Sequence, residues 1–222
     1  LNVFGRFDWK LLREIMDTSV WTMLQLFIAV GIWFGFFLAV EHLGEQPLAV
    51  VNIIRSVSNI SFMMFSAFAT VTSSLVSNLI GAGHSDQVLK LIRRTAGLAF
   101  IGSGAFLVIF ALFPNPILRI FTDSAVLIDA TRETMYAIVI NTMIQTGAYI
   151  VYNAVSGTGN TRVALLIELI ATVVYGVAIY IVVIVLRSSV ALCWLCDSTY
   201  ALTIGLASFL YLWSGRWKNR RV

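Results

Sequence analysis

Charged residues are absent from six long stretches of the sequence. The stretches cover residues 18–40, 56–85, 95–118, 134–161, 169–186 and 198–215. A helix crosses a bilayer with roughly 17–25 apolar residues, so each stretch is long enough to span a membrane. The 222-residue chain is 59% hydrophobic and 12% charged, whereas a soluble domain carries about 25% charged residues. The pattern predicts an all-α, polytopic membrane protein and excludes a water-soluble globule.

The spacing of these stretches predicts six transmembrane helices with short connections. We expect the spans at residues 16–41, 47–81, 95–118, 132–156, 163–186 and 190–214. The chain then divides into an interfacial amphipathic linker (1–17), a six-helix transmembrane lobe (18–215) and a basic cytoplasmic tail (216–222). A second basic amphipathic segment, 88–94, is expected to rest on the membrane surface. Because the sequence starts at Leu1 without a methionine, we expect a piece of a longer chain.

Lysine and arginine flank the spans unevenly, which predicts their orientation. With the N-terminus inside, eleven basic residues lie on the cytoplasmic side and four lie outside or within a span. Cytoplasmic loops carry the excess of positive charge, so both termini are predicted to be cytoplasmic. Since the basic residues flank hydrophobic spans, the net charge of +4 does not predict nucleic-acid binding.

The second expected span carries a polar stripe on one face. Its members recur every fourth residue, with Phe62 at the one apolar position: Ser58, Ser66, Thr70, Ser74 and Asn78. Such a face looks toward protein or a water-filled cavity and away from lipid. Close helix packing and cavity lining both explain this stripe, and Ser66 and Thr70 are the cavity candidates.

The fourth expected span carries larger polar side chains at the same spacing. They are Asn141, Gln145, Tyr149 and Asn153. Amides and phenols are costly to bury unpaired, which favours a ligand-facing role over simple packing.

The first expected span contributes two further cavity candidates and a packing motif. Thr22 and Gln25 share one helical face. Gly31 and Gly35 form a small-x-x-x-small pair, which predicts close helix packing.

Three ionisable residues stand within or beside the expected spans: Arg55, Glu168 and Asp197. A charge at a helix centre costs on the order of 2.5–3.5 kcal/mol on insertion scales, so each requires a partner, a cavity or a route to the headgroups. For each of the three residues, the sequence allows either a functional role or a structural ion pair. Asp197 lies near the outer end of its span, where reaching the headgroups is the alternative.

The sequence offers no catalytic or metal-binding constellation. It lacks a P-loop, a nucleophile elbow, a pair of catalytic carboxylates and histidine ligands at metal spacing. Cys193 and Cys196 stand in an apolar stretch without a second ligand pair, and are interpreted as small apolar residues. We therefore expect no enzyme activity, and movement of a solute is the function that remains.

Six short segments, taken in their order along the chain, form a recognisable series. They are residues 52–57, Gly81-Ala82-Gly83-His84, the basic connector with Lys90, Arg93 and Arg94, Phe121-Thr122-Asp123, the glycine-rich turn 156–162 and Gly215-Arg216-Trp217-Lys218. Together this series resembles the MATE (multidrug and toxic compound extrusion) family.

The resemblance implies one lobe of a twelve-helix transporter, with this chain as the C-terminal six-helix lobe. MATE proteins exchange small amphipathic or cationic compounds for Na⁺ or H⁺ by alternating access. The implied partners are such substrates, membrane lipid and the missing N-terminal lobe, in a bacterial cytoplasmic (inner) membrane. Some members carry an acid in the first and fourth helices of this lobe. Here those stretches contain none, and Gln25 stands nearest to such a position. No cofactor is expected, and the coupling ion is expected in the missing N-terminal lobe.

Two other functions remain open from the sequence. A flippase for lipid-linked saccharides in the same superfamily would need a more cationic cavity, because its cargo bears phosphate. A non-transporting membrane assembly subunit would use the polar stripes only for helix packing.

Overall fold

The computed structural model describes residues 9–217, apart from the side chains of Lys10, Leu11, Glu14, Ile15, Asp17, Thr18, Thr22 and Gln25. The elements are α1 (Trp9–Glu41), α2 (Glu45–Gly81), η1 (Ser85–Gln87), α3 (Val88–Leu112), α4 (Pro114–Leu118), α5 (Ala125–Gly157), α6 (Thr161–Ile179), η2 (Tyr180–Val185) and α7 (Val190–Trp213). Within the described range, six helical segments are long and apolar enough to cross a membrane. The predicted all-α class with six transmembrane helices is confirmed.

The third span lies earlier in the sequence than predicted. Residues 88–94, expected on the membrane surface, form the first turns of α3, which ends at Leu112 and not at 118. Phe113 leaves the helical conformation (φ −126°, ψ 52°), as expected for a residue before proline. Pro114 then begins the short helix α4.

Other helix ends also differ from the predicted ones. Helix α5 begins at Ala125, ahead of the predicted 132, because the Ser124 side chain caps it by accepting a hydrogen bond from the Leu127 amide. Helix α1 runs without a break from Trp9 through the predicted boundary between linker and lobe at 17/18. Residues 1–8 of that linker and 218–222 of the tail lie outside the described residues.

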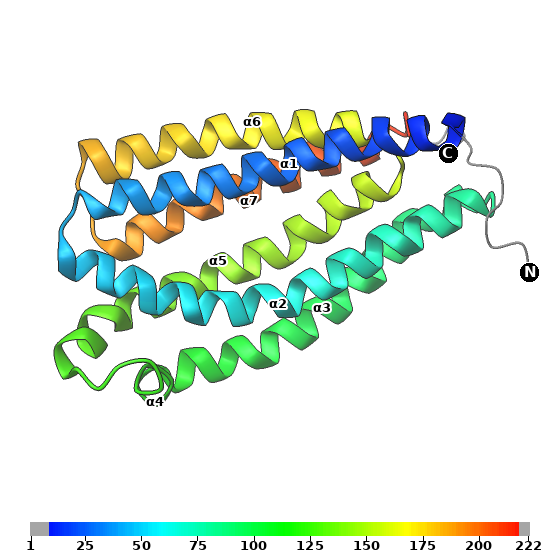
Figure 1. The fold of residues 1–222 in the computed structure, drawn as a ribbon. Helices are drawn as coiled ribbons and strands as arrows, with labels where there is room; N and C mark the ends of the chain where they lie inside the picture. Colours follow the sequence, from blue (N-terminus) through cyan, green and yellow to red (C-terminus); the bar gives the residue numbers. More distant parts are fainter. Residues whose placement is uncertain (1–8, 218–222) are drawn as a thin grey trace, which may run out of the picture.

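Helix α5 lies at the centre of the bundle (Figure 1). It packs against α2, α3, α6 and α7. Helix α1 packs mainly along α6 and meets α2 over a smaller contact. Side chains of α1, α2, α5 and α7 line a cavity between these four helices.

Two glycines allow α5 to approach its neighbours closely. A Cβ atom on Gly157 would lie 2.4 Å from the carbonyl oxygen of Ser73 on α2, and one on Gly205 of α7 would lie 2.9 Å from Cβ of Ala148. Small residues permit such backbone contact between membrane helices. The Gly31/Gly35 pair does not act in this way, since a Cβ at either position would meet nothing within 4 Å.

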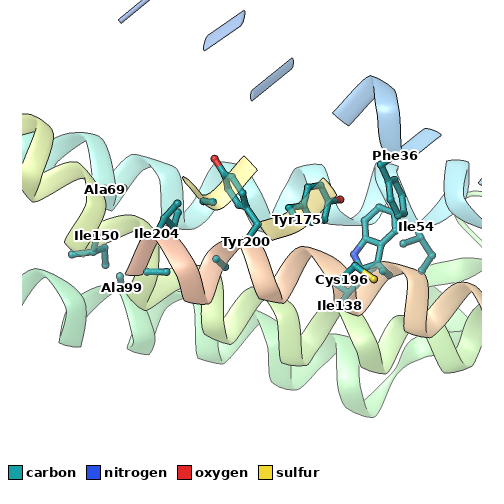
Figure 2. Close-up of a cluster of buried hydrophobic side chains, with 14 of the residues drawn as sticks. Phe36, Ile54, Ala69, Ala99, Ile138, Ile150, Tyr175, Cys196, Tyr200 and Ile204 are labelled. Atoms are coloured by element: carbon teal, nitrogen blue, oxygen red, sulfur yellow. The ribbon is translucent and has the colours of Figure 1, made fainter. Parts of the chain in front are cut away.

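The buried apolar core joins side chains of α1, α2, α3, α5, α6 and α7 (Figure 2). Tyr175 of α6 and Tyr200 of α7 pack within it, with ring centroids 5.9 Å apart. Cys193 and Cys196 are free and buried. Both thiols contact backbone carbonyls, as expected for small core residues.

Candidate functional site

A cavity of about 440 Å³ lies between α1, α2, α5 and α7. Its aromatic lining consists of Trp33, Phe34, Phe37, Phe62, Tyr149 and Trp194. Its polar lining consists of Arg55, Ser58, Asn59, Asn141, Thr142, Gln145 and Asp197. A largely aromatic pocket with a few convergent polar groups is typical of small-molecule binding sites.

The aromatic wall forms where α1 meets α7. The rings of Trp33 and Trp194 have centroids 6.1 Å apart in an edge-to-face arrangement, and Phe37 stacks on Trp33 at 6.3 Å. On the α5 side, Tyr149 packs against Phe62 of α2, with ring centroids 6.1 Å apart. These faces can contact a flat apolar ligand and can stabilise a cation by cation–π interaction.

The polar wall is built around the carboxylate of Asp197. Asn141 Nδ2 donates a hydrogen bond of 2.9 Å to Asp197 Oδ2, and Gln145 Nε2 donates to the same oxygen. The hydroxyl of Ser198 donates to Asn141 Oδ1 at 2.9 Å. Both amides come from α5, where a spacing of four residues places them on one face. Asp197 Oδ1 accepts no hydrogen bond from the described residues, so one carboxylate oxygen remains available.

Asp197 has no basic partner in the described part of the chain. The one ion pair among those residues joins Arg132 and Asp129, at 3.2 Å. Arg55 lines the same cavity from α2, where its guanidinium lies 5.0 Å from the ring centroid of Phe37. The Ser58 hydroxyl is buried without a hydrogen-bond partner among the described residues. The cavity therefore contains an unpaired acid, a base held over an aromatic ring and an unsatisfied hydroxyl.

The structure brings together some of the residues predicted for the cavity. Asn141, Gln145 and Tyr149 line it, as do Arg55 and Asp197. Asp197 is only 8% exposed and hydrogen-bonded, so it does not reach toward the headgroups.

The other predicted residues lie elsewhere. Asn153 donates to the Tyr149 carbonyl. Ser66 and Thr70 lie farther along α2, outside the cavity lining, and their hydroxyls donate to carbonyls of the same helix. Glu168 is buried between α6 and α7. The side chains of Thr22 and Gln25 lie outside the described residues.

Sequence reasoning missed the aromatic wall and Ser198. Trp33 and Phe34 could not be separated from lipid-facing residues, because aromatic side chains suit both places. For α7 a signal existed, since Trp194 and Asp197 are three residues apart and therefore share a helical face.

A family sequence model described as MatE matches residues 22–182. The chain belongs to the MatE family. The predicted family resemblance is thus confirmed.

A curated relative agrees with this assignment. The chain is 26% identical over 221 residues to the "Probable multidrug resistance protein NorM" of Thermotoga maritima. The match covers 96% of this chain and 46% of the relative. The chain therefore spans about half the length of the curated relative it matches.

Solved structures show the same fold. A crystal structure of MATE in the bent conformation matches with a TM-score of 0.79 at 16% identity, over 91% of this chain and 45% of the other. A MOP superfamily transporter from Pyrococcus furiosus matches with a TM-score of 0.75 at 17% identity, over 91% of this chain and 45% of the other. Its structure is described as having a binding pocket of reverse polarity that suggests a different function.

Proposed function

We propose that this chain is one lobe of a MATE exporter whose cavity binds amphipathic organic cations. The observation that carries the proposal is the Asp197 carboxylate, which lies in an aromatic-lined cavity without an ion pair from the described residues. A buried carboxylate is costly unless a cation accompanies it. A bound organic cation would neutralise Asp197 and place its apolar part against Trp33 and Trp194.

The remaining features of the transport cycle are also proposals. The family resemblance favours exchange of the substrate for Na⁺ or H⁺ by alternating access between two lobes, with this chain as the C-terminal one. An acid of the N-terminal lobe would hold the coupling ion. The distribution of lysine and arginine favours cytoplasmic termini in a bacterial inner membrane.

Binding of ethidium, a planar aromatic cation, tests the proposal in the purified full-length protein. Fluorescence titration of Asp197→Asn should show binding weaker by about 30-fold or more, because removing one partner of a desolvated charge pair costs about 2–5 kcal/mol. The control is Asp123→Asn, which changes an exposed carboxylate outside the cavity. Unchanged ethidium affinity in Asp197→Asn would contradict the proposal.

A second pair of variants tests the amide that holds the carboxylate. Gln145→Leu removes one donor to Asp197 Oδ2 and should weaken ethidium binding and lower drug resistance at unchanged expression. Asn153→Leu is the matched control, since it changes an amide of the same helix that does not line the cavity. Equal losses in the two variants would indicate a general effect on α5 and not a role in the cavity.

One observation favours the flippase as a second candidate. Arg55 lines the cavity from α2 and could contact the phosphate of a lipid-linked saccharide. In that case Arg55→Gln would abolish binding of a phosphate-bearing lipid while Asp197→Asn would improve it. The multidrug proposal predicts that Asp197→Asn has the larger effect, measured on ethidium.

A further inference from the structure

A second buried carboxylate lies outside the cavity. Glu168 of α6 is 3% exposed and accepts a hydrogen bond from the Tyr200 hydroxyl of α7 through Oε1. The Tyr152 hydroxyl of α5 faces the same carboxylate. Tyr200 itself packs on Tyr175 in the core (Figure 2). Phenol groups from two helices, α5 and α7, thus converge on one acid of α6, which does not line the cavity.

The groups around Glu168 include no cation from the described side chains. Tyr152 faces it from α5 and Tyr200 faces it from α7. Helix α1 also packs on α6, but its described side chains add no ionisable group to the cluster. Arg162, near the start of α6, holds its guanidinium 5.5 Å from the ring centroid of Trp21. The negative charge of Glu168 is therefore not balanced by a salt bridge within the described part of the chain.

The two buried acids have different hydrogen-bond donors: side-chain amides surround Asp197 and phenol hydroxyls surround Glu168. Amide nitrogen can only donate, and Ser198 holds the Asn141 amide with its nitrogen toward Asp197. That arrangement suits an ionised carboxylate. Phenol hydroxyls can donate or accept. The hydroxyls around Glu168 can therefore satisfy the carboxylate when it is ionised and the carboxylic acid when it is protonated.

We propose that Glu168, with Tyr152 and Tyr200, forms a proton-binding site in this lobe, separate from the cavity at Asp197. A proton can neutralise the buried Glu168 carboxylate without displacing any packed side chain. A larger cation would have to push neighbouring side chains aside. Tyr149, which lines the cavity, precedes Tyr152 by three residues on α5, so one helix contributes to both regions. Only a proton is gained or lost in this step, and no covalent bond between heavy atoms changes.

Infrared difference spectroscopy of the full-length protein in lipid nanodiscs tests the site without any substrate. Spectra recorded between acidic and alkaline buffer should contain the carbonyl stretching band of a protonated carboxylic acid buried from water. Glu168→Gln should lose this band. Glu133→Gln, which changes an exposed acid of α5, and Asp197→Asn should both retain it. A wild-type spectrum without the band, or a band lost in Asp197→Asn instead, would overturn the inference.

A second variant keeps the test decisive if Glu168→Gln does not fold. Tyr200→Phe removes one hydroxyl and keeps the ring, so it should shift both the frequency of the band and the pH at which it appears. If Glu168 and Tyr200 only join α6 to α7, the variant loses stability and shows no pH-dependent band to shift, which overturns the inference. Ethidium binding is measured separately, so a failure of the proton site leaves the proposed substrate site untouched, and the reverse also holds.

Discussion

The hydroxyl of Ser198 holds the side-chain amide of Asn141 in one orientation. It donates a hydrogen bond to Asn141 Oδ1 at 2.9 Å, which leaves Nδ2 directed at Asp197. Ser198 and Asp197 are adjacent on α7, so this helix contacts one amide of α5 at two points. The availability of Asp197 to a ligand cation therefore depends on a serine that does not line the cavity.

Ser198→Ala should weaken ethidium binding by about 2- to 10-fold, since a neutral hydrogen bond contributes about 0.5–1.5 kcal/mol. Without the hydroxyl, the Asn141 amide can rotate and present its oxygen to Asp197. The matched control is Ser208→Ala on the same helix, whose buried hydroxyl has no hydrogen-bond partner among the described residues. Fluorescence titration of both variants measures the effect. Equal affinities would show that the orientation of the amide is unimportant.

Tyr149→Ala should weaken ethidium binding by about 2- to 10-fold, whereas Tyr149→Phe should bind nearly as well as the unaltered protein. The reason is that Tyr149 presents a ring to the cavity and packs on Phe62 and Phe65, and an aromatic contact contributes about 0.5–1.5 kcal/mol beyond its area. Tyr136→Ala, which changes an exposed tyrosine of α5, is the control. A large loss in Tyr149→Phe would instead assign the effect to the hydroxyl.

Cysteine labelling distinguishes a water-filled space from helix packing along α2. Cysteines introduced at Ser66 and Thr70 should react with a membrane-impermeant maleimide, because these residues continue the face that lines the cavity at Ser58 and Phe62. A cysteine at Thr72, which is fully buried, should remain unlabelled. Protection at Ser66 and Thr70 equal to that at Thr72 would favour the assembly-subunit function.

Gly157→Ala should destabilise the protein by about 1–3 kcal/mol, the usual cost of overpacking. The added methyl group would lie 2.4 Å from the carbonyl oxygen of Ser73, and all three atoms nearest to it belong to the backbone of α2. Gly176→Ala is the matched control, since its Cβ would meet nothing within 4 Å. The melting temperature in detergent measures both. A Gly157→Ala protein as stable as the control would show that α2 and α5 can separate at little cost.

The positions of the spans follow from the sequence better than their ends do. The absence of charge along α3 predicts a membrane helix, but charge marks the edge of the hydrocarbon and not the end of the hydrogen-bonded helix. Residues 88–94 therefore continue α3 although they are basic. The π-helical segment η2 at the end of α6 left no recognisable sign, because its residues Tyr180–Val185 are as apolar as the helix before them.

The sequence likewise predicts one part of the candidate site and not the rest. The four-residue spacing on α5 predicts that Asn141, Gln145 and Tyr149 share a face, and all three line the cavity. Asp197 is more than fifty positions away from the two amides it binds. No local periodicity reports such a contact, since it depends on how α5 and α7 pack.

Sequence alone determined the membrane environment, the helical class and the family, because burial of the backbone in lipid permits few structures and charge is excluded from the spans. Tertiary structure decided which polar side chains contact one another. Ser66 and Asn141 both belong to polar rows on apolar helices. The Ser66 hydroxyl donates to a carbonyl of its own helix, whereas the Asn141 amide donates to the buried Asp197 carboxylate of another helix. The physical reason is that periodicity gives only the face of a helix, whereas packing determines what that face meets.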